Sequence, residues 1–185
     1  MSEVIVRPLQ LDDLVRLHGW QNEPHLVPYY MRDAISLGQV TAKFTPRIEG
    51  RHHCACLVAE YDGAAFGYAQ WYLNRDYVGA GISLPDRPDG VSIDYFIGAP
   101  AYLGRTLGHR MLDALVRNAR QNLAPADRLF HIGHDDRNTA AIRCALNAGF
   151  AKAGTYSDKG AASSLFARDG RCGKPDRLDG SHSST

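Results

Sequence analysis

Tyr102-Leu103-Gly104-Arg105-Thr106-Leu107-Gly108-His109 is the most informative segment of this chain. Before it, residues 91–97 read Val-Ser-Ile-Asp-Tyr-Phe-Ile, a composition rich in the β-branched and aromatic residues that favour strands. After it, apolar residues recur at the spacing of one helix face, at Leu107, Met111, Leu112, Leu115, Val116, Ala119 and Leu123. The segment is therefore predicted to be a tight turn that leads from a strand into a long helix.

Such a turn is suited to binding an anion. The first backbone N–H groups of a helix have no partner within the helix, and the helix dipole favours negative charge at that end. Gly104 and Gly108 allow a phosphate to approach the backbone closely, and Arg105 adds a cation. An ordinary strand-to-helix turn has the same features, so the turn alone leaves both interpretations open.

The surrounding sequence resembles the GNAT acetyltransferases. Residues 103–108 are similar to their pyrophosphate loop, which runs Arg/Gln-x-x-Gly-x-Gly/Ala, and residues 138–150 resemble a later helix of the family that ends in Ala-Gly-Phe. Residues 67–72 and 92–95 are similar to segments of the aminoglycoside 6'-N-acetyltransferase branch. The resemblance extends from about residue 4 to residue 168, with its motifs in order and at the right spacing.

This resemblance implies the GNAT fold, an α/β (α+β) architecture in which helices flank a central mixed, mostly antiparallel sheet with a splayed strand. Residues 1–170 are expected to form one acetyltransferase domain, and the polar residues 171–185 a disordered tail. Periodicity and turn signals predict strands at residues 4–9, 54–61, 65–73, 91–98, 128–133, 151–156 and 162–168. Helices are predicted at residues 11–20, 107–123 and 138–149; the pattern permits another at 32–44, and residues 74–90 are predicted to be a loop.

Composition argues against several classes of protein. The chain has 21 Lys and Arg residues against 20 Asp and Glu, so its charge provides no general attraction to nucleic acid or to a membrane surface. No apolar run is long enough to span a bilayer, and the first residues do not resemble a signal peptide. We therefore expect a cytoplasmic protein, monomeric or homodimeric, with a small molecule as its partner.

Neither a disulfide framework nor a metal site is expected. The cysteines are Cys54, Cys56, Cys144 and Cys172, too few for a disulfide scaffold in a chain of this length and compartment. His52 and His53 precede two of them, but strand alternation separates the two rings, and no second ligand pair follows at zinc spacing. His131 and His134 are split between opposite strand faces in the same way.

The resemblance implies that acetyl-CoA is the cofactor and assigns its phosphates to the turn. The implied cofactor-binding residues are Leu103, Gly104, Arg105, Thr106, Leu107, Gly108 and His109. The pantetheine arm would lie along residues 94–98, with the backbone N–H of Phe96 or Ile97 facing the acyl oxygen. Asn138 is similar in position to a family asparagine that contacts the arm, although helix capping would also explain it.

The resemblance assigns the catalytic position to Asp94. An ordinary aspartate is a weak base, so its implied role is to bind and orient a cationic amine and to take its proton as attack proceeds. The alternative is a solvated aspartate at a strand edge. The residues predicted to contact a small polycationic amine are Asp94, Gln70, Tyr72, Trp20, Asp135 and Asp136.

Three positions depart from the family pattern. Ala145 replaces a tyrosine that follows Arg-Cys in the aminoglycoside branch and that could protonate the leaving thiolate. Gly133 replaces a substrate-binding aspartate, and Asp135, at the same strand parity, is the candidate substitute. Thr106 replaces a glycine, and its N–H serves a phosphate provided that the residue needs no positive φ.

The leading hypothesis is direct, acetyl-CoA-dependent N-acetylation of a primary amine, with the 6'-amine of an aminoglycoside as the first candidate. A second hypothesis keeps the enzyme but changes the acceptor to another small amine or a hydroxylamine. A third is a non-catalytic module that binds coenzyme A or another ligand. Acetylation of protein N-termini has less support. Cys144 lies within a helix, where its thiol is not activated as an acyl carrier.

Overall fold

The computed structural model describes residues 3–31, 33–77, 90–124, 126–158 and 160–170. The strands are β1 Val4–Pro8, β2 Cys54–Tyr61, β3 Ala64–Leu73, β4 Val91–Ile97, β5 Leu129–Asp135, β6 Ala151–Asp158 and β7 Ala161–Asp169. The α-helices are α1 Leu14–Gln21, α2 Leu37–Ile48, α3 Leu107–Asn122 and α4 Thr139–Asn147. Short helical turns are η1 Leu11–Asp13, η2 Val27–Met31, η3 Asn74–Tyr77 and η4 Pro100–Tyr102.

The strands form one mixed sheet in the order β1-β2-β3-β4-β5-β7-β6. All neighbouring pairs are antiparallel except β4 and β5, which are parallel. That parallel ladder consists of two residue pairs, Val91 with Phe130 and Ser92 with His131, after which the strands diverge. The predicted splayed strand is therefore β4, which keeps β3 along one edge and opens along the other.

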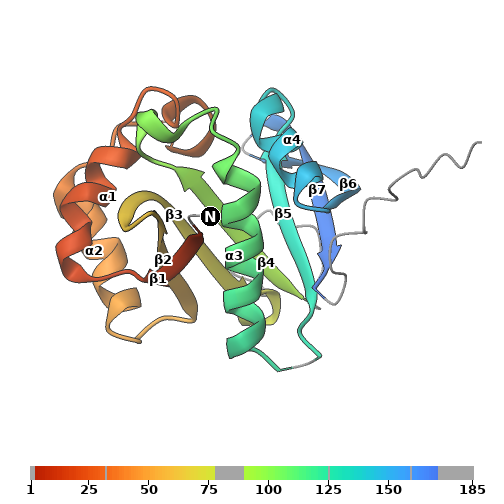
Figure 1. The fold of residues 1–185 in the computed structure, drawn as a ribbon, viewed down its shortest axis with the longest axis horizontal. Coiled ribbons are helices and arrows are strands. Elements are labelled where there is room, and N and C mark those ends of the chain that lie inside the picture. The colour runs from red at the N-terminus through yellow and green to blue at the C-terminus, as the bar shows by residue number, and fades with distance from the viewer. Residues whose placement is uncertain (1–2, 32, 78–89, 125, 159, 171–185) are drawn as a thin grey trace, which may run out of the picture.

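Helices cover both faces of the sheet and divide the core in two. Figure 1 shows α3 along the sheet, α1 and α2 grouped on one side of the molecule, and α4 with β6 and β7 on the other. One core cluster joins α3 and α4 to β4 through residues such as Ile93, while the other joins α1 and α2 to β4 through Phe96. Because side chains alternate along a strand, Asp94 lies on the α1–α2 side and Tyr95 on the α3–α4 side.

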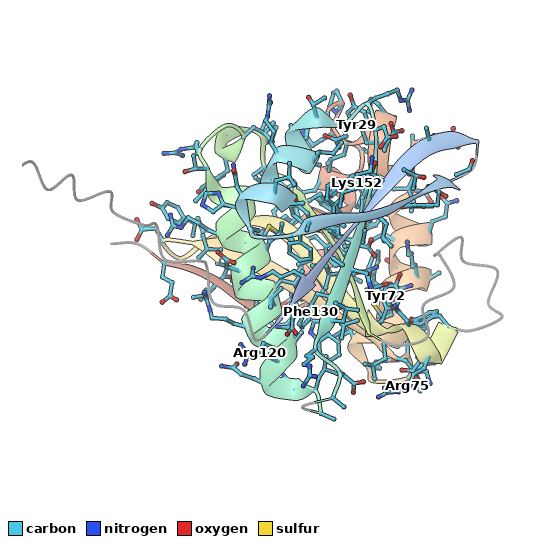
Figure 2. The ribbon with its side chains drawn as sticks, turned by 90° about the vertical axis from the view of Figure 1, so that its right-hand side faces the viewer. Tyr29, Tyr72, Arg75, Arg120, Phe130 and Lys152 are labelled. Atoms are coloured by element: carbon cyan, nitrogen blue, oxygen red, sulfur yellow. The ribbon has the colours of Figure 1, made fainter. Side chains whose placement is uncertain are left out.

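The predicted amphipathic helix is confirmed as α3, which begins at Leu107 and buries the apolar stripe read from the sequence. Its buried residues are Leu107, Met111, Leu112, Ala114, Leu115, Val116 and Ala119. Each fully buried Leu, Met or Val contributes about 1.5–3 kcal/mol of transfer free energy. Figure 2 shows Phe130 in the interior beside this helix, whereas Arg75 and Arg120 lie at the periphery. Because this apolar face packs on the sheet, the first turn of α3 lies where β4 and β5 separate.

The two hairpins and the cap of α4 are also confirmed. Asp62 and Gly63 both have positive φ, 53° and 75°, as the tightest hairpin turns require. The side chain of Asn138 accepts a hydrogen bond from the Ala141 N–H at 3.1 Å and so caps α4. Gly149 follows the helix with a φ of 80°.

The early helices differ from the prediction. The pattern permitted a helix over residues 32–44, but α2 begins at Leu37 and extends through Pro46 to Ile48. Ser36 and Gln39 form a capping box that starts the helix. Pro46 lies in the last turn, where the lost backbone hydrogen bond is tolerated because α2 packs its apolar face on β2.

Several other predictions concern segment ends. The helix expected at residues 11–20 divides into η1 and α1, and the loop expected at 74–90 begins as η3. Residues 78–89, the predicted tail 171–185 and Cys172 lie outside the described residues. The single domain over residues 1–170 stays a prediction. Within the described residues, no helix is both long and apolar enough to cross a bilayer.

A buried ion pair joins β1 to the start of η1. Arg7 donates from Nη1 and Nη2 to the two oxygens of Asp13 at 2.7 and 2.9 Å, and from Nε to Glu60 at 2.7 Å. Only 8 % of the Asp13 side chain is exposed. The hydrogen bond from Arg7 lowers the pKa of Asp13, against the opposing effect of burial. The pair therefore ties the edge strand to the first helical segment.

We predict that Asp13→Asn lowers the free energy of unfolding by about 1–2 kcal/mol at neutral pH, because Arg7 loses one of its two carboxylate partners in a partly buried setting and keeps Glu60. The folded-state pKa of Asp13 lies below its unfolded value, so its contribution is present above that unfolded value and is lost as the pH falls through the folded pKa. Urea unfolding at pH 7 and in acid should show the difference between the two proteins shrinking in acid. Asp12→Asn, at an exposed neighbour, is the control.

Candidate active site

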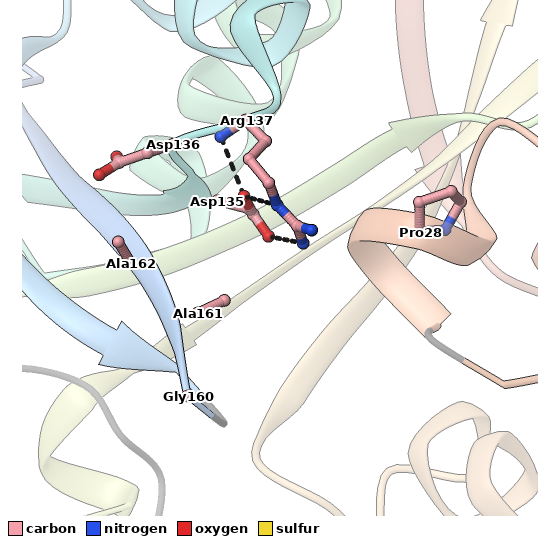
Figure 3. Close-up of a pocket in the computed structure, with 7 residues that line it drawn as sticks. All are labelled: Pro28, Asp135, Asp136, Arg137, Gly160, Ala161 and Ala162. Atoms are coloured by element: carbon pink, nitrogen blue, oxygen red, sulfur yellow. Dashed lines mark hydrogen bonds and ion pairs between the residues drawn. The ribbon is translucent and has the colours of Figure 1, made fainter.

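A cavity of about 660 Å³ occupies the splay between β4 and β5. It extends from the turn before α3, residues 103–109, to Asp94 on β4, and it is bounded by the end of β5 and the start of α4. A second cavity of about 460 Å³ adjoins it and shares Asp135 and Arg137. Figure 3 shows this second cavity between the Pro28 segment and the β6–β7 hairpin.

The turn before α3 presents backbone donors to the first cavity. Gly104 has a φ of 72° and Thr106 a φ of 57°, and no side chain caps the helix that begins at Leu107. The Thr106 hydroxyl donates instead to the Arg105 carbonyl at 2.6 Å. Gly108 faces α4 so closely that a Cβ there would lie 2.6 Å from the Cys144 sulfur. The uncapped start of α3 suits a pyrophosphate, whereas the missing side chain at Gly108 makes room for Cys144 of α4.

Thr106 does not meet the condition set by the sequence analysis, that it should need no positive φ. Its φ is positive, in the left-handed region, and a β-branched residue is rare there because its Cβ crowds the backbone. The backbone N–H remains part of the cavity lining. Thr106 thus keeps the donor that a phosphate needs, at a conformational cost that a glycine would not have.

The open edge of β4 offers the N–H of Ile97 rather than that of Phe96. The N–H of Gly98 donates to the Phe66 carbonyl at 2.9 Å, toward β3. Because peptide groups alternate in direction along a strand, the N–H groups of Phe96 and Asp94 share that direction, and those of Ile97 and Tyr95 face the splay. The Ile97 carbonyl faces the same way, and His25 Nε2 lies 2.8 Å from it. The choice between the two predicted donors falls on Ile97.

Asp94 is half-buried, lines the cavity and is held in one orientation. Gln70 Nε2 donates to Asp94 Oδ2 at 2.6 Å, and the amide oxygen of Gln70 accepts from the Tyr68 hydroxyl at 2.7 Å and from Arg47 Nη1 at 3.1 Å. Burial raises the pKa of Asp94, whereas the Gln70 hydrogen bond and the charges of Lys43 and Arg47 act in the opposite direction. A raised pKa makes the carboxylate a better base.

Two predicted substrate contacts lie in the core and not at a cavity surface, so nothing in the geometry supports their role, which stays a prediction. Trp20 is 7 % exposed and packs against Gly98, where a Cβ would overlap the indole. Tyr72 is 8 % exposed, and its ring centroid lies 4.6 Å from that of Tyr77. Neither residue lines either cavity. Gln70 serves the site through Asp94, not through the cavity surface.

Asp135 and Asp136 lie at the second cavity, as Figure 3 shows. Both oxygens of Asp135 accept from Arg137, at 2.9 Å from Nε and 2.6 Å from Nη2. Asp136 accepts from the Ser164 hydroxyl at 2.6 Å. Both carboxylates border the space where an acceptor would approach Asp94, but Asp135 already has a cationic partner.

Sequence reasoning missed several residues that shape the site. The Tyr156 hydroxyl fills the space beside Gly133, where a Cβ would overlap it, which explains why no larger side chain stands at that position. Burial, followed by the charges of Asp158 and Asp94, raises the pKa of Tyr156 to about 12. The sequence did not predict the effect of Lys43 and Arg47 on Asp94, because these residues lie far from Asp94 in the chain. The contact of His25 with the distant Ile97 carbonyl likewise has no local sequence signal.

Comparisons with known proteins agree with this geometry. The chain matches the acetyltransferase (GNAT) domain family over residues 10–157. It is 28% identical over 159 residues to the aminoglycoside N(6')-acetyltransferase type 1 of Klebsiella pneumoniae, covering 84% of this chain and 78% of that protein. The structure of AAC(6')-Ib with ribostamycin and coenzyme A superposes with a TM-score of 0.81 at 25% identity, covering 96% of this chain and 99% of the other.

The AAC(6')-Ib complex with parmomycin and acetyl-CoA gives the same TM-score, 0.81, at 24% identity, covering 96% of this chain and 99% of that chain. The predicted GNAT fold is thereby confirmed, and these structural neighbours contain acetyl-CoA or coenzyme A, the cofactor predicted for this chain. The geometry gives the position of each site residue, and the role of each stays a prediction.

We predict that Thr106→Gly stabilises the protein by about 1 kcal/mol, because glycine adopts a positive φ without the Cβ clash. In a protein of this size that corresponds to a Tm increase of roughly 2–4 °C, measured by calorimetry. Affinity for coenzyme A should stay within about twofold of the parent value, since the N–H is kept. Gly104→Ala is the opposing control: its Cβ meets no atom within 4 Å, so a lower Tm would report strain alone.

Proposed function

The chain belongs to the GNAT acetyltransferase family and takes acetyl-CoA as its acetyl donor, and we propose that it acetylates the 6'-amine of an aminoglycoside antibiotic, which would confer resistance. The observation that carries the proposal is the place of Asp94. Its carboxylate is oriented by Gln70 at the splay, in the same cavity as the turn before α3. The relatives named as aminoglycoside N(6')-acetyltransferases support the choice of acceptor.

The residues of the turn would hold the donor. The uncapped N–H groups at Thr106, Leu107 and Gly108 face the cavity and suit the pyrophosphate, with Arg105 adding positive charge. The free N–H of Ile97 is placed to donate a hydrogen bond to the acyl oxygen, where negative charge develops during attack. His25 would have to release the Ile97 carbonyl for the pantetheine amide to pair there.

Asp94 would bind the acceptor's ammonium and take one proton from it. The lone pair of the resulting neutral amine then forms the bond to the acyl carbon, and the C–S bond breaks with its electrons moving to sulfur. The nitrogen loses its second proton to solvent, which leaves a neutral amide and a thiolate. The raised pKa of Asp94 suits it to this proton transfer better than a solvated aspartate. Direct attack is favoured over an acyl-enzyme, because burial raises the pKa of Cys144 and so leaves it a thiol at neutral pH.

A second candidate acceptor, another small amine, is favoured by the charges around Asp94. Lys43 and Arg47 act on its pKa from α2, and Asp135 is already paired with Arg137. Tyr156 excludes a larger side chain at Gly133. Positive side chains therefore already compensate part of the negative charge of Asp94 and Asp135. This leaves less of it to attract a polycationic sugar.

The test of the acceptor is thiol release from acetyl-CoA with a panel of aminoglycosides, including one that has no free 6'-amine. We expect turnover with kanamycin and ribostamycin and none with the analogue lacking the amine. Turnover of only small monoamines would select the second candidate. If no amine were acetylated while coenzyme A still raised Tm, the catalytic proposal would be wrong and the non-catalytic module would be favoured.

We predict that Asp94→Asn lowers kcat/KM by about 10²–10⁴-fold, because the variant keeps the shape but cannot accept a proton. Coenzyme A affinity, measured by calorimetry, should be unchanged, since Asp94 lies away from the turn. The matched control is Asp12→Asn, which removes an exposed carboxylate outside both cavities and should leave kcat/KM near the parent value. Equal kcat/KM for Asp94→Asn and the parent protein would refute the assignment.

A further inference from the structure

The hydroxyl of Tyr95 is a buried polar group with no structural task. Tyr95 lies on β4 next to Asp94 but on the opposite side of the sheet, and it lines the first cavity. Within the described residues, its oxygen is buried and makes no hydrogen bond of ordinary geometry. Its polar neighbour is the thiol of Cys144 on α4. An unsatisfied buried hydroxyl costs about 1–3 kcal/mol relative to a bonded one, so the group calls for an explanation.

The position of this hydroxyl relates it to the path of a bound thioester. The Cys144 sulfur lies against Gly108, in the first turn of α3. Ile97 lies two residues beyond Tyr95, about 6.6 Å along the same strand edge. An arm that runs from the α3 turn to the Ile97 N–H therefore passes the Tyr95 hydroxyl. Because sulfur and oxygen are bound to one acyl carbon, a thioester oxygen at Ile97 brings its sulfur to the Tyr95 side.

We propose that the Tyr95 hydroxyl donates a hydrogen bond to the thioester sulfur and stabilises the thiolate as the C–S bond breaks. The inference rests on the acetyl transfer of the proposed function, whichever amine is the acceptor. The amine nitrogen bonds to the acyl carbon, its proton goes to Asp94, and the C–S electron pair stays on sulfur. On α4, Ala145 stands where the aminoglycoside branch has a tyrosine, so that position has no hydroxyl. Tyr95 supplies the donor from β4 instead.

The hydroxyl acts by hydrogen bonding and keeps its proton. Burial raises the pKa of Tyr95 well above 10, whereas a thiol has a pKa of about 8.5, so transfer of the proton to the thiolate would be uphill. A neutral donor in a buried site still stabilises negative charge, because no water competes for it. Tyr95 thus resembles a single donor of an oxyanion hole, directed at sulfur.

Among the described residues, the two side chains that neighbour Tyr95 supply no positive charge to the sulfur at neutral pH. His134 on β5 meets the Tyr95 ring edge-on at 6.1 Å, and burial lowers the pKa of His134 to about 4, so it is neutral. Cys144 on α4 is kept as a neutral thiol by burial. The Tyr95 hydroxyl is therefore the strongest donor among these neighbours.

The first test needs no acceptor. Calorimetry compares the binding of coenzyme A with that of desulfo-coenzyme A, which has no thiol, at pH 7 and at pH 9.5. In the parent protein, coenzyme A should gain about tenfold in affinity over desulfo-coenzyme A on raising the pH, because the thiolate accepts the Tyr95 hydrogen bond. Tyr95→Phe should show no such gain. The desulfo compound cancels any titration of His134 or Cys144.

The second test is kinetic. With any amine that is turned over, Tyr95→Phe should lower kcat about tenfold or more and leave KM for acetyl-CoA within about twofold. Its Tm should not fall, since the variant removes an unsatisfied hydroxyl and keeps the ring. Tyr61→Phe, on β2 outside both cavities, controls for the loss of a phenol.

The two proposals fail separately. A parental kcat and a parental pH gain in Tyr95→Phe would overturn the role of Tyr95, even if aminoglycosides were good substrates. The pH gain of the parent protein, abolished in Tyr95→Phe, would support that role even if every aminoglycoside were refused. A Tm that falls together with kcat, with no change in the pH gain, would make Tyr95 a packing residue and overturn the proposal.

Discussion

The divergence of β4 from β5 is the constraint on which the rest of this structure depends. After two residue pairs the parallel ladder ends, so β4 has an unpaired edge inside the domain. Unpaired backbone groups in a protein interior are costly unless something bonds to them. Here His25 meets the Ile97 carbonyl, and the cavity leaves the neighbouring N–H for a ligand. The same break puts Asp94 on one side of the opening and Tyr95 on the other.

The long helix α3 completes the site from the other end. Its apolar stripe fixes the helix on the sheet, and this fixes where its first turn meets the cavity. The turn is strained at Thr106, and that strain is tolerated because the packed helix holds the residue in place. The position of this turn and the open edge of β4 therefore follow from the packing of α3 on the sheet and from the divergence of β4 and β5.

Much of this was predictable from local sequence. The period of α3, the Asp62-Gly63 turn and the Asn138 cap each depend on residues close in the chain, and the resemblance placed Asp94 correctly at the splay. Trp20 and Tyr72 lie in the core and not at the cavity, and the sequence could not show this because an aromatic side chain gives the same signal in a core and in a cleft. The contacts of Arg47 and His25 could not be predicted for another reason: their partners, Gln70 and Ile97, are distant in sequence, and no local pattern records such contacts.

The charges on the acceptor side suggest how a cation would enter. Asp135 has only 7 % of its side chain exposed, whereas 70 % of the Arg137 side chain is exposed. The Asp135 carboxylate is thus buried in the structure, whereas the exposed Arg137 guanidinium is held mainly by its two hydrogen bonds to Asp135. The exposed guanidinium can leave this carboxylate at little cost to itself, because water solvates it well once it has left. If the acceptor is a polyamine, one ammonium can replace Arg137 at Asp135 while another is bound at Asp94. Selectivity would then depend on the spacing of the amines rather than on the net charge of the site.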